Sequence, residues 1–172
     1  PRRRRRRNGR RPATAKTTPI LPPTLDTHLK RLSDRLLLAE MSNTIPGLPA
    51  PDFSNRNFRF APQVSWKLAF LRAEIASVEP GEVRSFFWTA FSETVRESSY
   101  TRNGEFKLYR MPADKMTGFD PDVFAIFLGK ATRNRSGMAA YMATHRDVSV
   151  TVCDANTVNG DTPPNLPESG FD

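Results

Sequence analysis

The chain has 172 residues with 26 Lys or Arg, 18 Asp or Glu and one Cys, and its formal net charge is +8. This length suffices for one domain with a hydrophobic core and does not require two. The lone Cys153 excludes an intrachain disulfide and is typical of a reducing compartment. No apolar run approaches the roughly 18 residues of a membrane span, and the first residues lack the hydrophobic core of a secretory signal. We therefore expect no membrane partner.

The positive charge is concentrated at the N-terminus. Nine of the 26 basic residues and none of the 18 acidic ones lie within residues 1–16, which leaves 17 basic and 18 acidic residues and a net charge of −1 for the remainder. A near-neutral body with a basic arm indicates a polyanionic partner held through the arm. A targeting signal or a merely solvated tail is the alternative.

Three regions are predicted. Residues 1–23 form a basic disordered arm, because consecutive arginines repel one another and Pro12, Pro19, Pro22 and Pro23 oppose a continuous helix. Residues 24–153 form a helical bundle domain, and residues 154–172 form an acidic, Pro-containing tail.

Apolar residues at helical spacing predict the first helices of the bundle. The leucines at 25, 29, 32 and 36 give a stripe that favours a helix over 24–41. A second helix is expected from about Val64 to Val78 and a third from about Glu82 to Ser98, with a break at Pro80-Gly81.

Minor β structure is predicted at three places. Residues 57–60 alternate between polar and aromatic, and residues 100–110 contain Asn103-Gly104, which favours a hairpin. Residues 146–153 also alternate like a strand. The predicted fold class is therefore mainly α, with a minor hairpin or strand component.

The stretch from Phe119 to Arg135 combines an apolar helix with a cationic end. Asp120 is suited to the N-cap and Pro121 to the first helical position, and Ser136-Gly137 is expected to end the helix. The cations near its end have two open explanations. They complement the helix dipole at a C-terminus, or they form a clamp for phosphate groups.

No arrangement of residues indicates catalysis. The two histidines are far apart in sequence, Cys153 has no evident base beside it, and Gly129-Lys130 lacks the glycines of a phosphate-binding loop. We expect no enzyme activity, no metal site and no cofactor.

Several short motifs resemble the coat proteins of the tobamovirus type, which form rod-shaped plant viruses. Asp120-Pro121 and the run from Thr132 to Arg135 are similar to the start of the right radial helix and the RNA loop of that family. Phe106-Lys-Leu-Tyr-Arg110 is similar to a family strand, and Phe91-Ser-Glu93 recurs before it. The resemblance covers roughly residues 63–135. The fourth family helix is missing after the loop, which suggests a permuted order with the helix at 24–41 in its place.

The resemblance implies a helical bundle of the tobamovirus coat protein type, and a capsid protein that self-assembles, helically, around single-stranded RNA. Its partners would be RNA and further copies of itself in a viral nucleoprotein, and it would reside in the virion and the host cell cytoplasm. Alternatives are a viral silencing suppressor or movement factor that does not assemble, and an isometric capsid protein with an arginine arm.

The resemblance places phosphate contacts on Arg84, Arg133 and Arg135. Arg84 also lies in the first turn of a predicted helix, where the helix dipole disfavours a cation. The candidate RNA-binding residues are Arg84, Lys130, Arg133, Asn134 and Arg135 of the body, with Arg2, Arg3, Arg4, Arg5, Arg6, Arg7, Arg10 and Arg11 of the arm.

Overall fold

The computed structural model of the chain describes residues 19–42, 51–52, 54–101 and 109–144. Most of the predicted arm, the turn of the predicted hairpin, the predicted strand at 146–153 and the acidic tail lie outside these residues. The division into arm, bundle and tail stays a prediction.

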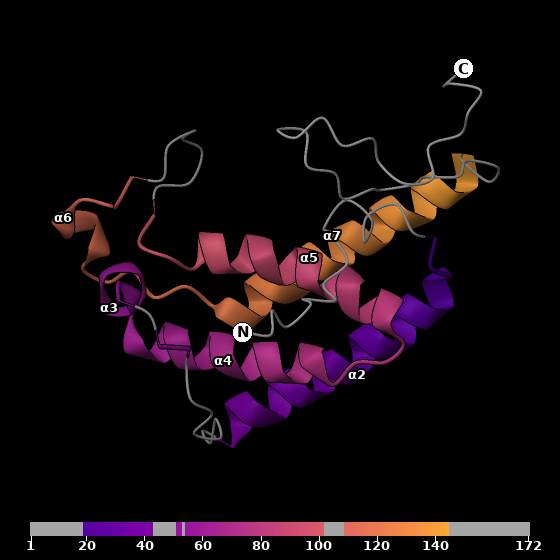
Figure 1. Cartoon of the computed structure of the whole chain (residues 1–172), viewed down its shortest axis with the longest axis horizontal. Coiled ribbons are helices and arrows are strands. Elements are labelled where there is room, and N and C mark those ends of the chain that lie inside the picture. Colours follow the sequence, from indigo (N-terminus) through magenta and orange to yellow (C-terminus); the bar gives the residue numbers. More distant parts are fainter. Residues whose placement is uncertain (1–18, 43–50, 53, 102–108, 145–172) are drawn as a thin grey trace, which may run out of the picture.

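The described part of the chain is mainly helical, as predicted. The elements are α2 (Pro22–Met41), α3 (Arg56–Arg59), α4 (Pro62–Ala76), α5 (Gly81–Glu97), α6 (Ala113–Met116) and α7 (Val123–Thr144). The long helices α2, α4, α5 and α7 alternate in direction along the chain (Figure 1). None of the described helices is long and apolar enough to cross a membrane.

The prolines at the start of α2 begin a helix instead of preventing one. Pro22 and Pro23 occupy the first turn, where the backbone N–H groups lack a helical partner and the fixed φ of proline suits the helix. The leucine stripe then determines which side is buried: Leu25, Leu32 and Leu36 are at most 3% exposed. The predicted helix at 24–41 is thus confirmed, with its start two residues earlier.

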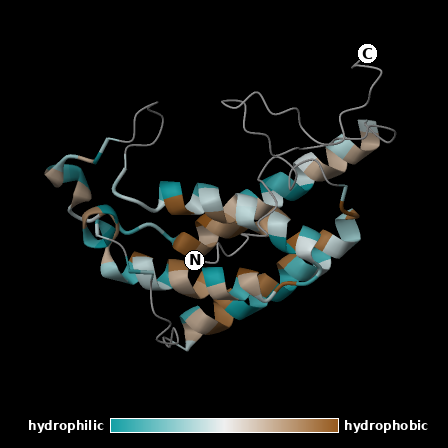
Figure 2. Cartoon of the chain, in the orientation of Figure 1, coloured by the Kyte–Doolittle hydropathy of each residue, from teal (hydrophilic) through white to brown (hydrophobic). Residues whose placement is uncertain are grey.

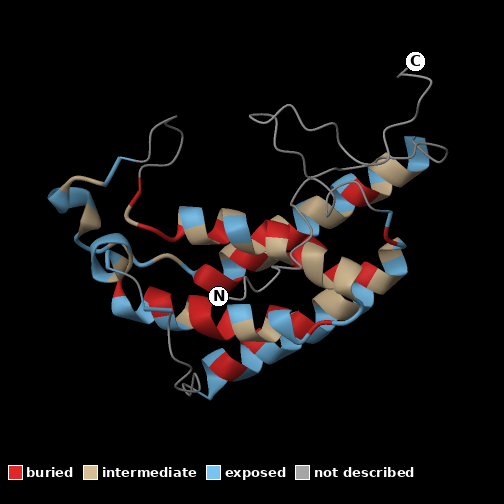
Figure 3. Ribbon diagram, in the orientation of Figure 1, coloured by how far each residue is buried: buried red, intermediate tan, exposed pale blue. Residues whose placement is uncertain are grey.

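Phenylalanine rings form the centre of the core. Phe87 of α5 and Phe127 of α7 are fully buried, and their ring centroids lie 6.2 Å apart. Phe70 of α4 lies 6.0 Å from Phe124 of α7. Buried and hydrophobic residues face the interior of the bundle, whereas the outer sides are hydrophilic (Figures 2 and 3). Aromatic contacts therefore tie α7 to α4 and α5.

α2 packs against α7 and α4. On the side toward α4, the Arg35 guanidinium donates to both carboxylate oxygens of Glu74, at 3.0 and 2.7 Å. This forked pairing raises the pKa of Arg35, mainly through the hydrogen bond to Glu74. An N-terminal helix thus completes the four-helix arrangement.

α7 differs from the prediction at both ends. The side chain of Asp122, and not that of Asp120, caps the helix: its Oδ1 accepts the N–H of Ala125 at 3.0 Å. The helix also passes through Ser136-Gly137 and ends at Thr144. A glycine inside a helix costs about 1 kcal/mol. Burial of Met138, beyond this point, favours continuation.

The predicted strand at 57–60 is wrong, because residues 57–59 belong to the short helix α3 and Phe60 is its C-cap. Four alternating residues are too few to specify a strand against tertiary contacts. Of the predicted hairpin, the described residues contain an isolated antiparallel bridge between Thr101 and Arg110.

Candidate nucleic-acid interface

The predicted phosphate clamp lies in the middle of a helix. Lys130, Arg133, Asn134 and Arg135 belong to the continuous helix α7, which runs on to Thr144. The prediction of a loop at Thr132–Arg135 is therefore wrong, and so is the explanation by the dipole of a C-terminus, since that effect fades within the last turn. The position of these cations needs another physical reason.

Two of the cations pair with acids across the contact between α5 and α7. Lys130 forms an ion pair with Glu97, and Arg133 Nη2 lies 2.5 Å from Glu93 Oε2. α5 and α7 run in opposite directions. Arg133, three residues after Lys130, therefore meets Glu93, which lies four residues before Glu97. The Arg133 side chain keeps 57% of its surface exposed, so it is accessible to a ligand as well.

Arg135 faces the opposite neighbour. Its Nε and Nη2 donate to Oδ1 and Oδ2 of Asp26 on α2, at 2.8 and 2.6 Å. The hydrogen bond from Arg135 is the main reason that the pKa of Asp26 is lowered, and the same bond raises the pKa of Arg135. Arg133 and Arg135 therefore hold α7 to two different helices.

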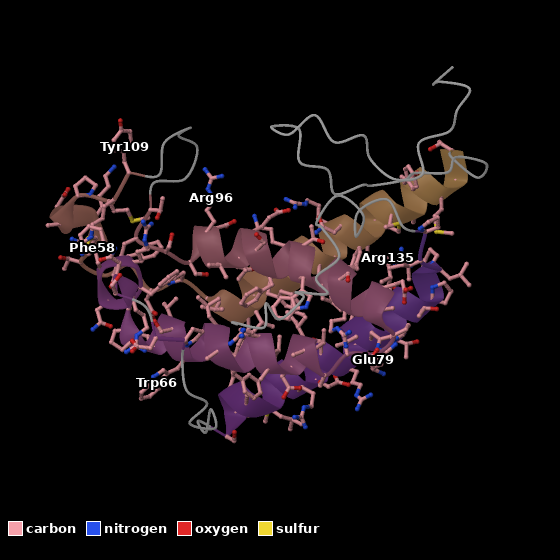
Figure 4. All side chains as sticks on the ribbon, in the orientation of Figure 1. Phe58, Trp66, Glu79, Arg96, Tyr109 and Arg135 are labelled. Carbon is pink, nitrogen blue, oxygen red and sulfur yellow. The ribbon has the colours of Figure 1, made fainter. Side chains whose placement is uncertain are left out.

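Arg84 has a structural reason for its place in the first turn of α5. Its Nη1 donates to the carbonyl of Val78 at 3.2 Å and lies 2.5 Å from Glu79 Oε1. The guanidinium thus binds the segment that links α4 to α5, which offsets the unfavourable dipole. Figure 4 places Glu79 and Arg135 toward the same side of the molecule.

A pocket of about 340 Å³ between α5 and α7 contains part of the predicted site. Its lining consists of Phe86, Thr89, Arg133, Asn134, Gly137, Met138 and Tyr141. Arg133 and Asn134 meet here beside two aromatic side chains. Arg84 does not line this pocket. Along α5 it is nine residues from Glu93, the partner of Arg133, which is about 13 Å along the helix axis at 1.5 Å per residue. The three arginines therefore do not form the single predicted groove.

The predicted phosphate-binding cations of the body are neutralised by nearby carboxylates. Each of the four predicted cations of the body has an acidic partner: Glu79, Glu93, Glu97 or Asp26. A phosphate would have to compete with these carboxylates, although exposed ion pairs contribute only about 0–1 kcal/mol. The unpaired positive charge predicted for the arm lies outside the described residues.

Sequence reasoning missed a second surface. Phe58 of α3 is half exposed, and the guanidinium carbon of Arg110 lies 4.0 Å from its ring centroid. Tyr109, next in sequence, is also half exposed. The adjacent aromatic and basic residues Phe58-Arg59 and Tyr109-Arg110 were the available clue, but the sequence does not show that they meet.

The chain resembles part of one curated protein, the type II methyltransferase M.MvaI of Kocuria varians. The two are 38% identical over 128 residues, which cover 72% of this chain and 28% of the relative. The chain thus spans less than a third of the length of the relative it matches. No family model and no solved structure matches this chain.

This likeness overturns the predicted identity. The tobamovirus resemblance is wrong, and with it the interpretation as a capsid protein, its viral alternatives and the location in a virion or host cell cytoplasm. The short motifs that carried it span two to five residues each. The match to the methyltransferase extends over 128 residues, and such a length outweighs them. The expectation of no enzyme activity is contradicted as well, because the relative is named as a methyltransferase.

A methyltransferase requires a methyl donor, and the described residues do not fit one. A nucleotide-type cofactor is commonly held by a glycine-rich turn between a strand and a helix. The described residues form helices and a single bridge, and the α5–α7 pocket presents Arg133 and Asn134 on a helical wall.

Proposed function

We propose that this chain is the helical, DNA-contacting region of a methyltransferase-type enzyme. The likeness to the type II methyltransferase over 128 residues carries the proposal. Since the chain spans 28% of that relative, methyl transfer is assigned to the protein as a whole, and contact with nucleic acid to this region. DNA replaces single-stranded RNA as the expected partner. Self-assembly is no longer expected, because it was inferred from the coat-protein interpretation.

The basic arm supplies most of the attraction in this proposal. Its arginines neutralise phosphates without reading sequence, and the release of condensed counterions drives the binding. Six arginines in succession, Arg2 to Arg7, match the dense charge of a duplex. The arm thereby supplies affinity for DNA, and the folded body determines how the DNA is oriented.

The exposed side of α7 is proposed to orient the duplex. Arg133 is more than half exposed, and Asn134 beside it offers an amide donor to a phosphate oxygen. Arg135 and Lys130 contribute where the DNA displaces Asp26 and Glu97. These contacts exchange one charge-assisted hydrogen bond for another, so each adds little affinity on its own.

Binding to a short labelled DNA duplex, followed by fluorescence anisotropy, tests the proposal. Sequence-independent contacts predict a dissociation constant of about 1–100 μM at physiological salt. The matched control is the same chain without residues 1–16, which should bind far more weakly. Absence of binding by the full chain at low salt would contradict the proposal.

A further inference from the structure

Two exposed aromatic side chains lie at one end of the bundle, away from the α5–α7 pocket. Phe58 is 50% exposed and Tyr109 is 51% exposed. Figure 4 shows both at the same end of the molecule, near α3 and α6. Together with Arg110 they are called the aromatic–arginine surface.

Backbone hydrogen bonds hold this surface in place. The Tyr100 N–H donates to the carbonyl of Arg59 at the end of α3, and the Met111 N–H donates to the carbonyl of Tyr100, both at 2.8 Å. The bridge between Thr101 and Arg110 fixes the adjoining segment. The rings are thus positioned before any ligand arrives, which lowers the entropic cost of binding.

The cations here differ from those on α7. Arg56, Arg59 and Arg110 form no ion pair with any described residue, whereas each predicted cation of α7 has an acidic partner. The Arg110 guanidinium instead lies over the Phe58 ring, 4.0 Å from its centroid. Its N–H groups have no acidic partner among the described residues and are therefore available to an anion.

Exposed rings beside unpaired arginines suit one kind of ligand. Bases stack on aromatic side chains irrespective of sequence, and arginines bind the phosphates between them. Bases inside an intact duplex are already stacked on one another and do not reach such rings. We propose that Phe58, Tyr109 and Arg110 form a binding site for unpaired bases in a single-stranded segment of nucleic acid. The inference shares with the proposed function only the nucleic-acid partner, because its residues are different.

Trp66 provides a matched control within the same chain. It is 61% exposed on α4, and no cation of the described residues lies over its ring. Exposure alone therefore does not distinguish it from Phe58. The aromatic–arginine surface differs from Trp66 because its exposed rings lie beside arginines that have no acidic partner among the described residues.

The test compares an oligo(dT) strand with a DNA duplex of the same length, using the full chain and its variants. Phe58→Ala with Tyr109→Ala should weaken oligo(dT) binding by roughly five-fold to a hundredfold per ring, and leave duplex binding unchanged. Phe58→Leu, which keeps an apolar side chain without a π face, should also weaken it. Trp66→Ala should change neither affinity. An oligo(rU) strand should bind comparably, because stacking does not require a particular sugar.

The outcomes separate the two proposals. If the parent binds duplex but not oligo(dT), or if the double variant and Phe58→Leu bind oligo(dT) as the parent does, the surface has no such role. If the parent binds oligo(dT) through these residues but does not bind duplex, the single-strand site is supported and the duplex contacts of the proposed function are contradicted. Unchanged melting temperatures of the variants show that the fold is intact.

Discussion

Arg135 and Asp26 are 109 positions apart in the chain and join α7 to α2 through two hydrogen bonds of 2.8 and 2.6 Å. A residue selected as a phosphate contact thus holds two helices together. The same holds for Arg133, whose partner Glu93 is on α5. The proposed DNA contacts and the stability of the bundle therefore depend on the same side chains.

Asp26→Asn tests the stabilising effect of the Asp26–Arg135 pair through its dependence on pH. The folded-state pKa of Asp26 is lowered by Arg135, so its stabilising effect is fully present above the unfolded pKa of about 3.9 and is lost as pH falls through the folded pKa. The variant should melt at a lower temperature than the parent near neutral pH, and the difference should shrink below about pH 3.9. Asp34→Asn, on the exposed side of the same helix, is the control. A difference that does not depend on pH would contradict the role of this pair.

Leu32→Ala should destabilise the chain strongly. Leu32 is 3% exposed where α2 packs into the bundle, and removal of such a side chain costs about 2–5 kcal/mol. Leu38→Ala, at a position that is 63% exposed on the same helix, should change stability little. Urea unfolding of both variants measures this. Equal effects would mean that α2 is peripheral.

Gly137→Ala should stabilise the chain by about 0.5–1 kcal/mol. The glycine lies inside α7, and a Cβ added there meets nothing within 4 Å. Thermal unfolding measures the change. Destabilisation would argue against a helix that continues past residue 136.

Much of the fold follows from local sequence, because the periodicity of leucine and phenylalanine specifies which helices form and which sides they bury. The extension of α7 does not, since Ser136-Gly137 favours a break locally, whereas Met138, Tyr141 and Met142 beyond it pack against the core. The ion pairs could not be predicted either: the partners of Arg133 and Arg135 are 40 and 109 positions away. The short coat-protein motifs were misleading for the same reason. They describe a local run of residues, and its surroundings decide whether it is a loop or a helix.

Glu93→Gln should strengthen DNA binding. It removes the carboxylate that competes with phosphate for Arg133, which is worth up to about five-fold in affinity for an exposed pair. Arg133→Ala should weaken binding by a similar factor. Glu74→Gln, which frees Arg35 between α2 and α4, is the control and should have little effect. Equal affinity of Glu93→Gln, Arg133→Ala and the parent would leave Arg133 with only its role between α5 and α7.

The salt dependence of duplex binding tests the central claim most directly. Each phosphate that the protein neutralises contributes about −0.9 to the slope of log affinity against log salt concentration. Deletion of residues 1–16, which carry nine basic residues and no acidic one, should make this slope shallower by several units while the melting temperature stays nearly constant. A slope that is the same with and without these residues would contradict the claim that the chain binds DNA through its basic arm.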